Sequence, residues 1–188
     1  LLKPLGAVLV AIEDHSGAMV NPDGIDPDAL AAYVAKHGYA QGFEGGTPVD
    51  HETFLRTQAD FFIPAALENQ ITAETAPLLN VKLMVEGANG PTDVDGDRIL
   101  QEKGITILPD VLCNAGGVIV SYFEWLQNKS SEFWDLAEVD ARLLKQILSA
   151  YRRVRDAVQH YNTDWRTAAY IVALTRLQAV YRERGIFP

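Results

Sequence analysis

The chain has 188 residues, of which 48% are hydrophobic and 22% are charged, a balance typical of a globular domain with a sizeable core. Its 16 basic and 25 acidic residues give a net charge of -9, which opposes binding to nucleic acid and to anionic membranes. The single cysteine, Cys113, excludes an internal disulfide framework, and no apolar segment is long enough to span a bilayer. We therefore expect a cytoplasmic protein with no nucleic-acid or membrane partner.

Short apolar segments alternate with helical patterns in the first part of the chain, which is typical of parallel strands joined by crossover helices. Strands are expected at residues 7–14, 60–66, 81–89 and 105–110. Helices are expected at residues 27–37, 52–57, 72–79, 93–103, 115–127, 136–161 and 164–184, with Asp26 and Asp164 as caps and Gly96 weakening the fourth. The pattern predicts an α/β fold in which an open, doubly wound parallel sheet is followed by a layer of helices.

Polar or small residues follow the expected strands, and ligands of open parallel sheets bind outside the carboxyl ends of the strands. Asp14 ends the first strand, Ala65 and Ala66 end the second, and Asn89 ends the third. An acidic residue in the position of Asp14 can accept hydrogen bonds from the ribose hydroxyls of a dinucleotide and repel a 2′-phosphate. An aspartate after an apolar strand is also a common turn former, so both interpretations of Asp14 remain open.

Two further segments have the composition of a binding site. In GANGPT (87–92), glycines flank Asn89, whose amide offers a donor and an acceptor to a carboxamide or an amino-acid head group; the alternative is a simple strand-to-helix turn. In NAGGVIVSYFEW (114–125), a helix starting near Ala115 would place Asn114, Val118 and Ser121 on one face. The Ser121 hydroxyl could bind a side-chain carboxylate, or it could donate to the carbonyl four residues before it.

Several runs, in this order along the chain, resemble the glutamate dehydrogenases of the Glu/Leu/Phe/Val dehydrogenase family. The matching runs are NPDG (21–24), PAALEN (64–69), VEGANGPT (85–92), LPD (108–110), NAGGVIVSYFEWLQN (114–128) and RTAAY (166–170). The resemblance covers the chain from Ala7 onward and implies a Rossmann-like nucleotide-binding domain with C-terminal helices. The SYFEW and GANGPT runs resemble the glutamate branch of the family more than the leucine or phenylalanine branches.

The resemblance also implies roles for individual residues. It places Asn89 and Asn114 beside the nicotinamide and the α-amino acid part of the substrate, and Val118 and Ser121 against the substrate side chain. It places Ala65 and Ala66 beside the nicotinamide ribose and gives Asp14 the ribose-binding position, so the expected cofactor is NAD, with NADP not excluded.

The chain also departs from the family pattern. It contains no GxGxxG turn, and the family's catalytic lysine and aspartate belong to a substrate domain that has no counterpart here. We therefore expect residues 1–128 to be a dinucleotide-binding domain without its first strand and glycine-rich turn, and residues 129–188 to be helices that pack on it. No catalytic residue is expected within the chain. The four histidines have no metal-ligand spacing, so no metal site is expected.

The function implied by the resemblance is the reversible oxidative deamination of L-glutamate to 2-oxoglutarate and ammonia, with this chain as the cofactor half of the enzyme. A homo-oligomer, a hexamer in the family, is expected, and the isolated chain is expected to be inactive. Two alternatives remain: a dehydrogenase for another amino acid, and a catalytically inactive assembly or regulatory subunit.

Overall fold

The structure is a computed structural model that describes residues 2–185. Its contacts divide into two compact units, which are described separately. The first unit contains the chain up to Phe62 together with Asn69–Lys82 and Thr92–Gly104. The second contains Ile63–Glu68, Leu83–Pro91 and the chain from Ile105 onward. The expected division at residue 128 stays a prediction.

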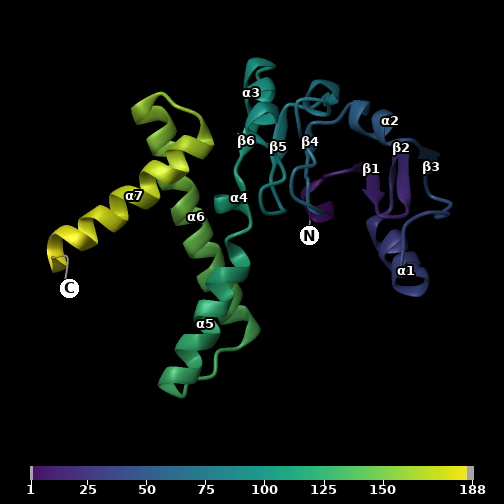
Figure 1. Cartoon of the computed structure of the whole chain (residues 1–188). Helices are drawn as coiled ribbons and strands as arrows, with labels where there is room; N and C mark the ends of the chain where they lie inside the picture. Colours follow the sequence, from purple (N-terminus) through teal and green to yellow (C-terminus); the bar gives the residue numbers. More distant parts are fainter. Residues whose placement is uncertain (1, 186–188) are drawn as a thin grey trace. The chain divides into compact units, whose positions relative to one another are not determined.

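The first unit contains an antiparallel three-stranded sheet with the order β1-β2-β3 (Figure 1). These strands are β1 (Leu9–Asp14), β2 (Gly17–Ile25) and β3 (Thr47–Val49). The tight turn between the first two brings Asp14 opposite Gly17, and further along the same hairpin Ile12 lies opposite Met19. Strand β1 was expected in a parallel sheet, and that prediction is wrong for the described part of the chain. The error arose because Gly17–Ile25 was not recognised as a strand that could return along β1.

The other elements of the first unit are the helices α1 (Pro27–His37), α2 (His51–Arg56) and α3 (Val94–Glu102), the short strand β4 (Phe61–Phe62) and two 3-10 helices (Lys3–Leu5 and Ala76–Leu78). The core beneath the antiparallel sheet is formed by Met19, Ile25, Leu30 and Ala40. Asp26 caps α1 as expected, because its carboxylate accepts hydrogen bonds from the Asp28 and Ala29 amides.

The close packing around Gly96 in α3 was not anticipated. The sequence identified Gly96 only as a residue that weakens the helix. In the structure it is buried, and a Cβ atom at this position would lie 2.4 Å from the Ile71 carbonyl oxygen. Glycine is therefore required here because the chain passes close to the helix.

The second unit has a short parallel strand pair and most of the helical content. Strand β5 (Leu83–Val85) pairs in parallel with β6 (Thr106–Leu108), so that Val85 lies opposite Leu108. The helices are α4 (Asp110–Cys113), α5 (Gly116–Ser130), α6 (Leu136–Tyr161) and α7 (Trp165–Arg184). The parallel pair and the three long helices were expected, whereas the short α4 was not.

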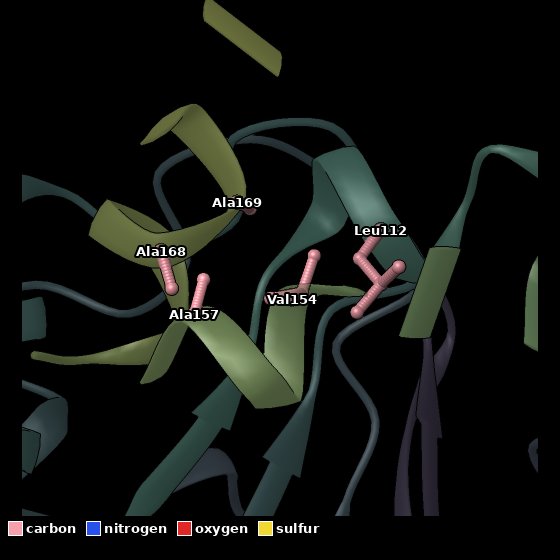
Figure 2. Close-up of a cluster of buried hydrophobic side chains, with 5 residues drawn as sticks. All are labelled: Leu112, Val154, Ala157, Ala168 and Ala169. Atoms are coloured by element: carbon pink, nitrogen blue, oxygen red, sulfur yellow. The ribbon is translucent and has the colours of Figure 1, made fainter. Parts of the chain in front are cut away.

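Helix α6 packs against both α5 and α7, and the expected bounds of α6 are confirmed. Figure 2 shows the small cluster where α4, α6 and α7 meet, formed by Leu112, Val154, Ala157, Ala168 and Ala169. Small side chains on α6 and α7 allow the two helices to approach closely at this point. The cluster thus packs α4, α6 and α7 together.

Candidate functional site

The ends of β5 and β6 bring two of the expected site residues into direct contact. Asn114 Nδ2 donates a 2.6 Å hydrogen bond to Asn89 Oδ1, although the two residues are 25 positions apart in the sequence. A longer bond of 3.4 Å runs from the same nitrogen to the Ala88 carbonyl oxygen. Asn89 and Asn114, which were expected along one edge of the sheet, thus lie beside one another.

The pairing leaves complementary groups on the two amides. Within residues 2–185, no hydrogen bond engages Asn89 Nδ2 or Asn114 Oδ1. Asn89 is exposed, and a Cβ atom at the following residue, Gly90, would meet no heavy atom within 4 Å. An amide donor and an amide acceptor side by side on an open surface are the complement of a carboxamide or of an amino-acid head group.

The PAALEN segment lies alongside the loop that carries Asn89. The amides of Gly87 and Ala88 donate hydrogen bonds of 3.0 and 2.9 Å to the Pro64 carbonyl oxygen. A Cβ atom at Gly87 would lie 3.2 Å from the Ala65 Cβ, so a glycine allows the two segments to approach. Ala65 and Ala66 are exposed beside this contact. The structure thus brings them to the same edge as Asn89.

Val118 and Ser121 lie on α5, which begins two residues after Asn114. Asn114 caps the C-terminus of α4 and precedes α5, so the expected single helical face applies to Val118 and Ser121 only. Val118 is 75% exposed, and Ser121 is also exposed. The Ser121 hydroxyl makes no hydrogen bond to any described residue, which contradicts the alternative that it bonds to the carbonyl of the preceding turn.

Asp14 is held in a tight turn of the first unit. One carboxylate oxygen accepts from the amide and the hydroxyl of Ser16, and the other accepts a 2.8 Å hydrogen bond from the Ala40 amide. Burial disfavours the charged carboxylate, but the hydrogen bonds from Ser16 and Ala40 outweigh it and hold the pKa of Asp14 below its usual value. The turn-forming interpretation of Asp14 is therefore confirmed. Only the oxygen that accepts from the Ala40 amide has a lone pair left for a further donor, and the ribose-binding role stays a prediction.

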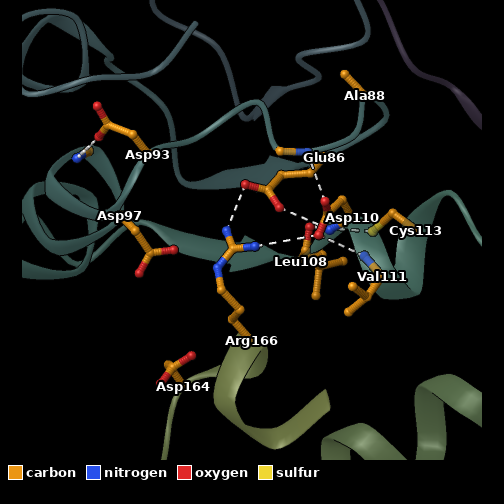
Figure 3. A network of polar contacts seen from close by, with 12 residues as sticks. Glu86, Ala88, Asp93, Asp97, Leu108, Asp110, Val111, Cys113, Asp164 and Arg166 are labelled. Carbon is orange, nitrogen blue, oxygen red and sulfur yellow. Dashed lines mark hydrogen bonds and ion pairs between the residues drawn. The ribbon is translucent and has the colours of Figure 1, made fainter. Parts of the chain in front are cut away.

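Figure 3 shows three charged residues, Glu86, Asp110 and Arg166, that received no role from the sequence. Glu86 is fully buried, and its Oε1 atom lies 2.7 Å from Arg166 Nη2. Its Oε2 atom accepts a 2.9 Å hydrogen bond from the Asp110 amide. Arg166 Nη1 also lies 3.5 Å from Asp110 Oδ1. All three lie within the runs VEGANGPT, LPD and RTAAY, which was the signal available in the sequence.

Cys113 lies at the edge of this network. Its Sγ atom lies 3.4 Å from the Leu108 carbonyl oxygen. Burial and then the charge of Glu86 raise the pKa of the Cys113 thiol to about 11. Because the thiolate is the reactive form, this cysteine is suited to packing and not to nucleophilic chemistry.

The helices of the second unit also enclose a cavity away from the asparagine pair's own residues. A cavity of about 440 Å³ lies among α5, α6 and α7 and is lined by Tyr122, Trp134 and four basic residues, Arg142, Lys145, Arg153 and Arg176. Within residues 2–185, no cluster of His, Cys, Asp or Glu side chains is arranged to hold a metal ion. None of the described helices is both long and apolar enough to cross a membrane.

Comparisons with known proteins identify relatives along the whole chain. The chain is 44% identical over 186 residues to the glutamate dehydrogenase of Thermotoga maritima, covering 99% of this chain and 45% of that protein. It is 42% identical to two Halobacterium salinarum proteins, an NAD-specific glutamate dehydrogenase and an NADP-specific one, covering 100% of this chain and 43% and 46% of theirs.

Among solved structures, the chain is again similar to glutamate dehydrogenases. The glutamate dehydrogenase of Peptoniphilus asaccharolyticus matches with a TM-score of 0.81 and 34% identity over 99% of this chain and 43% of that one. A hetero-hexameric glutamate dehydrogenase from Thermus thermophilus matches with a TM-score of 0.89 and 27% identity over 99% and 44%. The chain thus spans less than half the length of the relatives it matches. Because the model of the Glutamate/Leucine/Phenylalanine/Valine dehydrogenase family matches residues 1–185, the chain belongs to that family.

Proposed function

We propose that the chain is the cofactor-binding part of an NAD-linked glutamate dehydrogenase. The observation that carries this proposal is the contact between Asn89 and Asn114, which leaves one amide donor and one amide acceptor open at the ends of two parallel strands. Ligands of parallel α/β sheets bind at this edge. The glutamate dehydrogenases among the relatives support the choice of substrate class.

In the proposed reaction, the α-carbon of L-glutamate loses a hydride, and water then hydrolyses the resulting iminium to 2-oxoglutarate and ammonia. NAD supplies the hydride acceptor when it is bound. The two asparagine amides suit this cofactor, because a donor and an acceptor together can orient a carboxamide. Asn89 and Asn114 hold cofactor and substrate in register, while Ala65 and Ala66 leave room for the nicotinamide ribose.

The chain's other residues select the ligands. Val118 contacts the aliphatic part of the substrate side chain, and the unpaired Ser121 hydroxyl donates to the γ-carboxylate. Asp14 binds the adenosine ribose and disfavours NADP through its charge. The acid-base groups are supplied by the portion of the enzyme that this chain does not contain, and the active assembly is a hexamer.

This proposal is tested with a chimeric enzyme in which the chain replaces the matching segment of the Thermotoga maritima relative. We expect glutamate-dependent formation of NADH by this chimeric enzyme and none by the isolated chain. The parent enzyme serves as the control for assembly. A correctly assembled chimera that oxidises another amino acid, or none, would refute the proposal and favour one of the two alternative functions.

A further inference from the structure

Asp110 connects the two segments that carry Asn89 and Asn114, and it does so with two different groups. Its carboxylate accepts a 2.9 Å hydrogen bond from the Gly90 amide, directly after Asn89. Its main-chain carbonyl accepts a 2.9 Å hydrogen bond from the Asn114 amide. A single residue thus fixes the backbone on both sides of the amide pair.

The position of Asp110 is itself fixed by a buried ion pair. The Asp110 amide donates to Glu86, whose other oxygen is paired with Arg166. Glu86 is fully buried, and a buried carboxylate without a partner would strongly destabilise the folded protein. Arg166 reaches this pair from the first turn of α7 and also approaches the Asp110 carboxylate. Figure 3 shows these contacts converging on Asp110.

We propose that Asp110 is a positioning residue, which holds Asn89 and Asn114 at their mutual distance while the Glu86–Arg166 pair locks Asp110 in place. This inference rests on the proposed function, because it concerns the same two asparagines. The physical reason is that side-chain amides on two separate segments would otherwise sample many relative orientations. Orientation of reacting groups contributes strongly to catalysis, and small displacements reduce the rate markedly.

The test uses the chimeric enzyme with Asp110→Asn, which keeps the shape of the side chain but removes its charge. We expect the kcat for glutamate to fall roughly tenfold or more, with a much smaller change in the KM for NAD. This change weakens the 3.5 Å approach of Arg166 Nη1 to Asp110 but keeps the 2.7 Å Glu86–Arg166 pair and the bond from the Asp110 amide to Glu86, so the protein should still fold. Val154→Ala serves as the matched control, since it weakens the cluster of Figure 2 without altering a polar contact of the site.

A double-mutant cycle separates positioning from simple stabilisation. If Asp110 acts through Asn89, Asp110→Asn should have little further effect on kcat in an Asn89→Ala background. Val154→Ala should leave kcat per folded enzyme unchanged in either background. Equal losses from Asp110→Asn in both backgrounds would overturn the proposal.

Hydrogen exchange keeps this inference testable if the chimera shows no glutamate turnover, a result that would count against the proposed function alone. In the isolated chain, the Gly90 amide should exchange roughly tenfold faster in Asp110→Ala, which removes the acceptor of its hydrogen bond, than in the unchanged chain. Val154→Ala should not produce this local change. Unchanged protection of Gly90 in Asp110→Ala would show that the carboxylate does not hold the loop and would overturn the inference.

Discussion

Replacement of Ser121 by alanine separates substrate recognition from folding. Ser121 is exposed on α5, and its hydroxyl makes no hydrogen bond to any described residue. Exposed substitutions of this kind change stability by about 0.5 kcal/mol or less, and alanine is the better helix former. The thermal unfolding midpoint of Ser121→Ala should therefore equal or slightly exceed that of the unchanged protein.

The effect on glutamate should be much larger. A hydrogen bond to a charged group contributes about 1.5 to 3 kcal/mol, which corresponds to roughly ten- to a hundredfold in the specificity constant. Norvaline has a side chain of similar length without a carboxylate, so it should be affected far less. Both substrates are compared in the chimeric enzyme under saturating NAD. Equal losses for glutamate and norvaline would refute the reasoning and place the selectivity for the diacid elsewhere.

Four further outcomes are expected. In the chimeric enzyme, Asp14→Ser should lower the ratio of NAD to NADP specificity constants by about tenfold or more, and an unchanged ratio would remove Asp14 from the ribose site. In the isolated chain, the lowered pKa of Asp14 means that its charged form stabilises the fold above pH 3.8, the ordinary pKa of this group, and that this stability is lost as pH falls through the folded-state pKa. The free energy of unfolding should therefore fall less steeply on acidification in Asp14→Asn than in the unchanged chain. Gly96→Ala should lower the free energy of unfolding by about 1 to 3 kcal/mol in chemical denaturation, because the clash with the Ile71 carbonyl outweighs a helix-propensity gain of about 1 kcal/mol. Gly117→Ala is the control: its Cβ atom would meet no atom within 4 Å, so it should be neutral or stabilising. Cys113, with its pKa of about 11, should resist alkylation by iodoacetamide at neutral pH until the chain is unfolded, and rapid labelling of the native chain would contradict its environment.

The sequence predicted the elements that depend on local chemistry. Asp26 and Asp164 cap helices because their carboxylates bond to amides two or three residues away, an interaction that a short segment specifies by itself. Strand β2 was missed because it is stabilised by pairing with β1 and β3, and its proline and glycines made it look like a loop. The role of Gly96 was likewise set by a distant part of the chain.

In the candidate site, too, the features set by local sequence could be predicted and those set by distant packing could not. The placement of Asn89 and Asn114 at one edge could be anticipated, because both follow parallel strands, whereas the hydrogen bond between them is seen only in the structure. The pair of Glu86 and Arg166 could not, since it joins residues 80 positions apart through a helix whose placement depends on packing. The runs that contain these residues resemble the family, but only the structure shows that Glu86 and Arg166 form an ion pair beside Asp110.

The most direct test of the central claim follows the hydride itself. The chimeric enzyme is incubated with NAD and with L-glutamate that carries deuterium at its α-carbon, and the NADH formed is analysed by mass spectrometry. Transfer of the hydride from the substrate to the nicotinamide predicts NADH that carries one deuterium. NADH formed without deuterium, or labelled NADH obtained only from a different deuterated amino acid, would contradict the assignment of this chain to glutamate oxidation.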